Sequence, residues 1–247
     1  MLTVVGKGVK FVNIKGIIFD KDGTLADSRQ FLRELAQKRA RLIDCQIPGT
    51  GDPLLMAFGL QNQELNPAGL MAVGSRLENE IAAAAYIAET GKSWFEAKAI
   101  AVQAFLEADK YLPALEAISP PYDDTKEVLA KLSQAGLKLG ILSADSTLGV
   151  QEFVTKYQLS NYIELSMGVD SELTKPDPEL YLKACQSLNL PPSATLMVGD
   201  AQGDLEMAKK AGAGGAIAIY RHQQQNIKNL SQADIVINSL RDLEILT

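Results

Sequence analysis

The sequence predicts an α/β fold, with a doubly wound, mostly parallel sheet and an inserted all-helical second domain. From about residue 120 onward, short apolar runs alternate with segments whose apolar residues recur at helical spacing. This alternation is typical of parallel strands joined by helices that cover both faces of the sheet. One further apolar run lies near the N-terminus, and the region between shows helical patterns without a convincing strand. We therefore expect residues 1–26 and 120–247 to form the sheet domain, and residues 27–119 the helical one.

The first strand is expected at Ile14–Asp20, a short apolar run that ends in an acid. Helix formers with apolar residues at helical spacing then predict a helix from Ser28 to about Ile43. The stretch Cys45–Pro53 is interpreted as a loop because of its proline and glycine content. From Leu54 to Leu112 the helical pattern resumes, so no strand is expected in this region.

The second part of the sheet domain alternates strand and helix. Asp123 or Asp124 is a candidate N-cap for a helix that ends at Gln134, and Asp177 followed by Pro178 is a typical helix start. The expected strands are Leu137–Leu142, Tyr162–Ser166, Thr195–Val198, Gly215–Tyr220 and Asp234–Ile237. The other expected helices are Thr147–Tyr157, Pro178–Leu188, Leu205–Ala211 and one that begins at Ser239.

The composition favours a folded chain and excludes several classes of partner. The 247 residues are 47% hydrophobic and 22% charged, so disorder is not the main state. The net charge of −6 argues against bulk electrostatic binding to nucleic acid or to an anionic membrane. No apolar run approaches the ~18 residues of a spanning helix, and the N-terminal residues lack the apolar core of a signal peptide. We therefore expect a cytoplasmic protein.

The chain has a single histidine, His222, in the polar stretch RHQQQN, which is interpreted as a solvated loop. A catalytic triad built on histidine, or a metal site with several histidines, is therefore nearly excluded. Cys45 and Cys185 are far apart and lack metal-ligand spacing, so neither a disulfide framework nor a zinc site is indicated. Any chemistry has to come from carboxylates, hydroxyls, lysines and a metal held by oxygen.

Acidic residues follow two of the predicted strands directly. Asp20 and Asp22 come at the end of the first strand, and Asp200 and Asp204 come after a later one. Ser143 follows a third strand. Because ligands bind outside the carboxyl ends of parallel strands, we expect these side chains to share one edge of the sheet.

Such a cluster indicates a bound cation, because several carboxylates at close range do not all stay ionised without one or without a raised pKa. An all-oxygen site favours Mg²⁺, which takes one or two carboxylates together with water and substrate phosphate oxygens. Lys175, just before the helix at Pro178, would neutralise a bound phosphate, and Ser143 would help to orient it. Since phosphoryl transfer needs mainly positioning and charge stabilisation, these residues are close to sufficient for it.

Four motifs stand in order at these strand ends and helix starts: GIIFDKDGTLADS, ILSAD, LTKPDPELYLKA and LMVGDAQGDLEMAKKAGA. Together they resemble the four motifs of the haloacid dehalogenase-like (HAD) superfamily. More narrowly, they resemble its phosphoglycolate phosphatase-type hydrolases, which carry a helical cap after the first motif. The resemblance covers about residues 12–27 and 120–247; in the inserted domain it extends only to helices in the right place. It implies a Rossmann-like core, a cap domain and a Mg²⁺-dependent phosphatase that hydrolyses a small phosphomonoester through an aspartyl-phosphate.

The resemblance also assigns roles to the acids. Asp20 would be the nucleophile that forms the aspartyl-phosphate. Asp22 would be the general acid that protonates the leaving oxygen, and then the base that activates water. Mg²⁺ would be held by the carboxylates of Asp20 and Asp200 and by the backbone carbonyl of Asp22, while Asp204 would orient a metal-bound water.

By the same resemblance, Ser143 and Lys175 would bind the transferring phosphoryl group. The next position after this hydroxyl is often asparagine in relatives and is Ala144 here. One polar contact to substrate is therefore missing or comes from elsewhere. Lys21, between the two aspartates, either adds positive potential to the site or points away from it.

Other interpretations stay open. A phosphomutase of the same superfamily would use the same aspartyl-phosphate behind a cap that excludes water. A dehalogenase would not need Asp22 as a proton donor, a phosphonatase would need a Schiff-base lysine in the cap, and a silent binding module would be expected to have lost one of the acids. Taken alone, each acid is more often a turn or cap residue, and Arg76 in the inserted domain more often a solvated charge than a substrate contact. The identity of the phosphorylated metabolite, Mg²⁺ against Mn²⁺, and the oligomeric state are not specified by the sequence.

Overall fold

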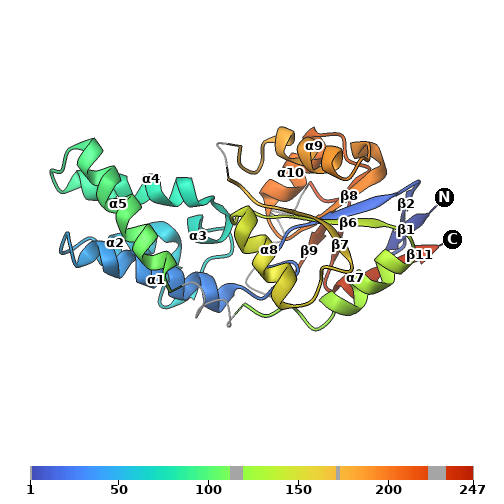
Figure 1. The fold of residues 1–247 in the computed structure, drawn as a ribbon, viewed down its shortest axis with the longest axis horizontal. Coiled ribbons are helices and arrows are strands. Elements are labelled where there is room, and N and C mark those ends of the chain that lie inside the picture. Colours follow the sequence, from blue (N-terminus) through green and yellow to red (C-terminus); the bar gives the residue numbers. More distant parts are fainter. Residues whose placement is uncertain (1, 112–118, 171–172, 222–231, 247) are drawn as a thin grey trace. The chain divides into compact units, whose positions relative to one another are not determined.

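The chain divides into two compact units, whose elements are drawn in Figure 1. We call Met1–Asp27 together with Pro121–Thr247 the sheet unit, and Ser28–Pro120 the helical unit. The computed structural model describes residues 2–111, 119–170, 173–221 and 232–246. The loop predicted at His222 lies outside the described residues.

The sheet unit is built on a parallel sheet. Its strands in the described residues are β3 (Gly16–Phe19), β6 (Lys138–Leu142), β7 (Ile163–Met167), β8 (Thr195–Gly199), β9 (Gly215–Ile219) and β10 (Ile235–Ile237). They form one six-stranded sheet in the order β10-β9-β8-β3-β6-β7, and each neighbouring pair runs parallel. The predicted doubly wound parallel sheet is therefore confirmed. A short 3₁₀ turn, η2 (Pro192–Ala194), leads into β8.

Helices cover both faces of this sheet. They are α7 (Thr125–Gln134), α8 (Thr147–Lys156), α9 (Pro178–Ser187) and α10 (Gln202–Lys210). In Figure 1, α9 and α10 lie on one side of the sheet and α7 and α8 on the other. Strand β3 shows why both faces need cover. Ile17 and Phe19 belong to the buried cluster with α7 and α8, while Ile18 belongs to the one with α9 and α10, because successive strand residues point to opposite faces.

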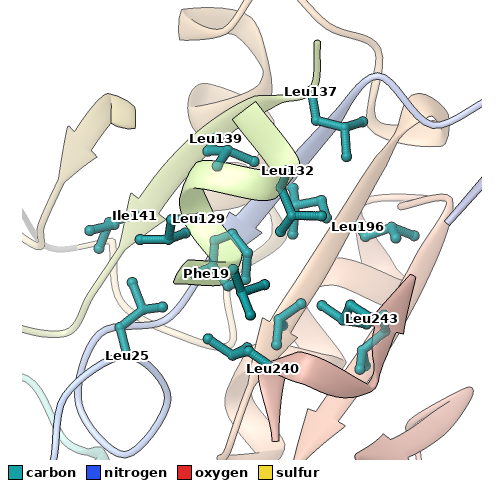
Figure 2. Packing of buried hydrophobic residues seen from close by; sticks show 14 of the residues in the cluster. Phe19, Leu25, Leu129, Leu132, Leu137, Leu139, Ile141, Leu196, Leu240 and Leu243 are labelled. Carbon is teal, nitrogen blue, oxygen red and sulfur yellow. The ribbon is translucent and has the colours of Figure 1, made fainter. Parts of the chain in front are cut away.

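The packing under α7 supports the strand that leads to the first motif. Figure 2 shows Leu129 and Leu132 of α7 close to Phe19 of β3, with Ile141 of β6 beside them. All four side chains are fully buried, and truncating a buried leucine to alanine costs about 2–5 kcal/mol. The end of β3 is therefore held in place by packing on the strands beside it and on this helix.

A second, antiparallel sheet joins the two ends of the sheet unit. Its strands are β1 (Thr3–Gly6), β2 (Val9–Val12) and β11 (Leu243–Leu246), in the order β11-β1-β2. The expectation of a single strand before the helical region is therefore wrong. Lys7 and Gly8, between β1 and β2, have φ values of 44° and 85°, as a two-residue hairpin turn requires.

The prediction of a last helix from Ser239 is also wrong. A 3₁₀ turn, η4 (Leu240–Asp242), leads directly into β11. The Ser239 hydroxyl accepts from the N–H of Arg241, and the Asp242 carboxylate accepts from the N–H of Ser239. This capping pattern is shared by 3₁₀ turns and α-helices, so it marks the start of a turn without specifying its length.

The helical unit has its own apolar cluster. Its helices in the described residues are α1 (Arg29–Asp44), α2 (Gly51–Phe58), α3 (Leu70–Val73), α4 (Arg76–Glu89) and α5 (Trp94–Asp109). Buried alanines such as Ala84 on α4 and Ala101 on α5 belong to this cluster, and small side chains allow helices to approach closely. Within the part of the chain that the structure describes, no helix combines the length and the apolar composition needed to cross a bilayer.

Two details of this unit differ from expectation. The predicted loop Cys45–Pro53 is shorter, because α2 already begins at Gly51. The region also contains a small hairpin, formed by β4 (Leu60–Gln61) and β5 (Glu64–Leu65). Its turn residues Asn62 and Gln63 have φ values of 49° and 66°. Strands of two residues are too short to give an alternating pattern in the sequence.

Candidate active site

The carboxyl ends of β3, β6 and β8 meet at one edge of the parallel sheet. β3 lies between the other two, and its last residue, Phe19, is in register with Ile141 of β6 and with Val198 of β8. The polar residues that follow the three strands therefore lie at a similar level. These residues are Asp20, Ser143 and Asp200. The N–H of Asp20 donates to the carbonyl of Val198 at 2.9 Å, which extends the ladder to the first acid.

The chain turns back sharply after β3. The N–H groups of Leu25 and Ala26 both donate to the carbonyl of Lys21 at 2.9 Å. Gly23 has a φ of 82°, and a β-carbon there would lie 2.2 Å from Oδ2 of Asp200. A larger residue would therefore be strained and would displace that carboxylate. The glycine of the first motif thus allows the turn after β3 to approach the acid after β8.

Three carboxylates gather at this edge. Asp20, Asp200 and Asp204 each offer an oxygen, and these oxygens lie within 4.8 Å of one another. Nζ of Lys175, from the loop before α9, lies 2.6 Å from Oδ1 of Asp20 and 2.7 Å from Oδ1 of Asp204. The other carboxylate oxygen of Asp204 accepts from the N–H of Ala201 at 3.2 Å. The structure therefore brings together four of the predicted site residues, and Asp204 is held from both sides.

The surroundings of this cluster oppose full ionisation of its acids. Burial raises the pKa of Asp20 to about 7; Lys175 opposes the shift, while Asp204 and Asp22 add to it. Burial also raises the pKa of Asp200 well above its usual value, and Asp20 and Asp204 add to that rise. For Lys175, burial lowers the pKa, but the two carboxylates that it contacts outweigh burial, and its pKa is raised. The single ammonium group thus does not outweigh burial and the repulsion between the acids.

The residues present fit a hard divalent cation. All three groups are carboxylates, which are the ligands that Mg²⁺ prefers in proteins. A cation among them would favour their ionised forms and so reverse the raised pKa of Asp20 and of Asp200. On the side of the turn after β3, the backbone at Gly23 approaches Asp200 so closely that no larger side chain fits between them. The acidic group is therefore a candidate metal site.

Asp22 lies beside a second cation. Nζ of Lys21 is 3.0 Å from Oδ1 of Asp22 and 3.1 Å from Oδ2 of Asp145. The Lys21 side chain is buried and lies 5.9 Å from the centre of the Phe153 ring. Burial lowers the pKa of Lys21, but the two carboxylates outweigh this and raise it. Of the two orientations that the sequence permits for Lys21, the structure therefore has the one in which its charge faces Asp22.

The second-motif residues lie next to Asp22. The hydroxyl of Ser143 is buried and lies 3.5 Å from Oδ2 of Asp22, which is at the outer limit of a hydrogen bond. Ala144 follows it and is half-buried, but adds no polar group. Arg76, which the sequence offered as a possible substrate contact, is paired with Glu80 at 2.8 Å and with Asp109 at 2.5 Å inside the helical unit.

Sequence reasoning missed a buried ion pair behind the turn. Arg221, just after β9, donates to both carboxylate oxygens of Asp124 at 2.7 and 3.0 Å, and to the carbonyl of Thr24 at 2.8 Å. Asp124 also accepts from the hydroxyl of Ser239 and from the N–H of Leu240. The available signal was a charged residue directly after a strand at the same sheet edge. Its partner is 97 positions away in the sequence, so the pairing could not be read from the pattern.

Comparisons with known proteins agree with the geometry. A family model described as haloacid dehalogenase-like hydrolase matches residues 14–212. The phosphoglycolate phosphatase of Salmonella typhi is 26% identical over 95% of this chain and 92% of its own length. The N-acetylmuramic acid 6-phosphate phosphatase of Pseudomonas putida is also 26% identical, over 92% of this chain and 93% of its own.

A solved structure described as a predicted phosphoglycolate phosphatase from Haemophilus somnus has the same fold. Its TM-score is 0.71 at 22% identity, over 94% of this chain and 96% of the other. The family model covers well over half of the residues and spans all four motifs. The resemblance drawn from those motifs is thereby confirmed, and this chain belongs to the haloacid dehalogenase-like hydrolases.

Proposed function

We propose that this chain is a Mg²⁺-dependent phosphatase that hydrolyses a small phosphomonoester through an aspartyl-phosphate. The observation that carries the proposal is the pairing of Asp20 with Lys175 at 2.6 Å, inside a group of three carboxylates at the end of β3. Asp22, two residues on, is more exposed than Asp20 and is close to Ser143. Relatives named as phosphatases support the reaction class.

In the first step, a carboxylate oxygen of Asp20 attacks the phosphorus atom of the ester. The bond between phosphorus and the ester oxygen breaks, and Asp22 gives its proton to that leaving oxygen. The Lys175 ammonium and the Ser143 hydroxyl bind the oxygens of the transferring group. The 2.6 Å contact between Nζ of Lys175 and Oδ1 of Asp20 supports this role, because the phosphoryl group would arrive at the Asp20 carboxylate.

In the second step, water attacks the phosphorus atom of the aspartyl-phosphate. Asp22, now ionised, takes a proton from the water as the bond between phosphorus and Asp20 breaks. Inorganic phosphate leaves, and both acids return to their initial states. One pair of carboxylates thus serves both steps without histidine, in a chain that has only one.

We assign Mg²⁺ to the carboxylates of Asp20 and Asp200 and the backbone carbonyl of Asp22, with Asp204 in support. Bound there, the ion would offset the charge of the carboxylates and of the phosphate oxygens. Asp204 holds Lys175 in place, because its Oδ1 lies 2.7 Å from Nζ. Sharing one ammonium between Asp20 and Asp204 aligns the cation and the nucleophile before substrate binds.

We further propose that the helical unit is the cap domain and that it selects the substrate, a small phosphorylated metabolite. Two relatives of equal identity are named for different substrates, phosphoglycolate and N-acetylmuramic acid 6-phosphate, so the reaction class carries over more securely than the substrate does. We also propose a cytoplasmic setting. The described cysteines, Cys45 and Cys185, are both free thiols, as is common in reducing compartments.

The test is phosphate release from a panel of phosphorylated metabolites and from p-nitrophenyl phosphate, with and without Mg²⁺. We expect release that depends on Mg²⁺ and that Asp20→Asn abolishes without unfolding the protein. Full activity in an Asp20→Asn variant would contradict the proposed mechanism. Isomerisation of a hexose phosphate in the presence of its bisphosphate, with little phosphate released, would instead assign the chain to the phosphomutases.

A further inference from the structure

Asp22 has to point its carboxyl group at the leaving oxygen, and the structure contains a device that fixes it. We infer that Lys21 and Asp145 are positioning residues that hold Asp22 for its role as a proton donor. This inference rests on the proposed function, since it gives Asp22 the same role. It adds two residues that act through Asp22. We call Lys21, Asp22 and Asp145 together the Lys21 bridge.

The contacts of the Lys21 bridge form a closed ring. Nζ of Lys21 lies 3.0 Å from Oδ1 of Asp22 and 3.1 Å from Oδ2 of Asp145. On the other side, the N–H of Asp145 donates to Oγ of Ser143 at 3.2 Å, and that hydroxyl lies 3.5 Å from Oδ2 of Asp22. Asp145 thus acts twice, through its carboxylate on Lys21 and through its N–H on Ser143.

The distances show which member fixes Asp22. The contact with Lys21 has a normal length for a charged hydrogen bond, while the contact with Ser143 is at the limit. Of these two contacts, the one with Lys21 is therefore the stronger, and the Ser143 hydroxyl can still donate to a phosphoryl oxygen. Because Lys21 contacts Oδ1, we place the donated proton on Oδ2 of Asp22, the oxygen on the side of Ser143.

Burial explains why the ammonium group cannot move away. The side chain of Lys21 is 6% exposed, against 17% for Asp22 and 35% for Asp145. A lysine is almost never this buried without partners. Its two carboxylates provide them, and the Phe153 ring lies 5.9 Å from the ammonium. A buried, paired cation is a rigid support, whereas an exposed one would exchange its partners with water.

The sequence makes room for this arrangement in helix α8. Gly149 lies in the first turn of α8, and a β-carbon there would lie 2.5 Å from Oδ2 of Asp145. That oxygen is the one that contacts Lys21. Glycine inside a helix costs up to about 1 kcal/mol relative to alanine. The close approach of Asp145 accounts for a residue that helix propensity disfavours.

The test compares two aryl phosphates that differ in how much their leaving group needs a proton. p-Nitrophenolate leaves readily as an anion, whereas phenolate depends more on a proton donor. The value measured is kcat/KM with Mg²⁺, which reports the steps up to cleavage of the ester. In Lys21→Met and Asp145→Ala, we expect kcat/KM for phenyl phosphate to fall about tenfold more than for p-nitrophenyl phosphate. Lys21→Arg keeps the cation and should recover part of the loss.

Gly149→Ala separates positioning from folding. The added methyl group displaces the partly exposed Asp145 carboxylate, while alanine favours the helix. We expect the same selective loss on phenyl phosphate with a melting temperature at or above that of the wild type. The matched control is Glu152→Ala, which removes an exposed acid from the same helix and should leave both substrates unchanged.

An equal loss on both substrates, or no loss, would overturn the inference while leaving the proposed function standing. If the wild type released phosphate from neither substrate and from no metabolite of the panel, the proposed function would fall, and this inference with it. A double variant, Lys21→Met with Asp145→Ala, should lose little more than Lys21→Met alone, because the two residues act as a unit. Additive losses would contradict a shared role.

Discussion

The sheet unit and the helical unit treat charge in opposite ways. In the sheet unit, two ion pairs near the site are buried: Lys175 with Asp20 has exposed fractions of 7% and 8%, and Arg221 with Asp124 has 6% and 1%. In the helical unit, pairs such as Lys92 with Glu96 are 39% and 48% exposed. The buried cation Arg39 lies on the Phe105 ring at 4.2 Å.

This difference in exposure shows where the fold bears the cost of removing charged groups from water. A buried ion pair gains little over well-packed apolar side chains, because both charges lose their hydration. An exposed pair costs little and contributes little. We therefore interpret the buried pairs next to the carboxyl ends of β3 and β9 as supports for the proposed site. Exposed pairs of the helical unit, such as Lys92 with Glu96, add about 0.5 kcal/mol or less to the stability of their helix.

The largest effect is expected at Lys175. In Lys175→Met the carboxylates of Asp20 and Asp204 lose their shared cation, and under the proposed function the phosphoryl group would lose a ligand. We expect kcat/KM for p-nitrophenyl phosphate to fall about 10³-fold. Lys92→Met removes a lysine from an exposed pair of the helical unit and should leave kcat/KM within twofold. If kcat/KM of Lys175→Met lay within tenfold of the wild-type value, the proposed difference between buried and exposed pairs would be wrong.

The next effect concerns stability. Arg221→Met leaves Asp124 buried without its cation, and we expect a loss of about 3–5 kcal/mol in the free energy of unfolding. Arg76→Met breaks the half-exposed pairs with Glu80 and Asp109 and should cost about 1 kcal/mol or less. Urea denaturation measures both. Equal losses in the free energy of unfolding would show that burial does not decide how much each ion pair contributes to stability.

The pH dependence of this effect has a defined sign. Burial opposes ionisation of Asp124, but hydrogen bonds from Arg221, Ser239 and Leu240 lower its pKa below the usual value. The ionised Asp124 therefore stabilises the folded protein above its unfolded-state pKa of about 4. This stabilisation is lost as the pH falls through the lower pKa of the folded state. The gap in stability between wild type and Arg221→Met should narrow in strong acid.

A smaller effect is expected for Mg²⁺ binding. Burial raises the folded-state pKa of Asp20 to about 7. The stability that comes from its bound proton is therefore present below the unfolded pKa of about 4 and is lost as the pH rises through 7. Mg²⁺ can take the place of that proton, so it should raise the melting temperature more at pH 8 than at pH 5.5.

The size of the Mg²⁺ effect follows from mass action. At a concentration of a hundred times Kd, the gain is about 2.7 kcal/mol. Asp200→Asn should lose most of it, whereas Glu89→Gln, at an exposed acid of the helical unit, should keep it. If Mg²⁺ raised the melting temperature equally at both pH values, its binding would not depend on loss of the proton from Asp20.

The smallest effect tests a feature in which the two units should not differ. Ser75 caps α4 through the N–H of Glu78, and Asp177 caps α9 through the N–H of Glu179. Ser75→Ala and Asp177→Ala should each cost about 1 kcal/mol. Thermal unfolding measures both. A much larger cost for Asp177→Ala would mean that the cap also supports Lys175, two residues before it.

The sequence predicted the sheet and the acids well, because these depend on local patterns. The apolar run before Asp20 and the one before Asp200 gave two strands, and parallel register then brought their ends together. Pro178 after Asp177 marked the start of α9. Such signals lie within a few residues of the feature that they predict.

The contacts that support the acids could not be predicted in this way. The sequence did not indicate the direction of Lys21, because its partner Asp145 lies in the loop after another strand, β6. The pairing of Arg221 with Asp124 links residues from two loops far apart in sequence. The strand β11 was mistaken for a helix because the pairing with β1, which decides its conformation, depends on residues at the other end of the chain.

The pairing of β1 with β11 also bears on the order in which the protein can fold during synthesis. Thr3 lies opposite Leu246, and β3 at the centre of the sheet needs β8, more than 170 residues later. The helical unit, by contrast, is a continuous stretch, Ser28–Pro120, so its internal contacts do not require residues made later. Strand β3, which is buried on both faces in the folded sheet, is therefore synthesised well before β8 and has no β8 to pair with until then.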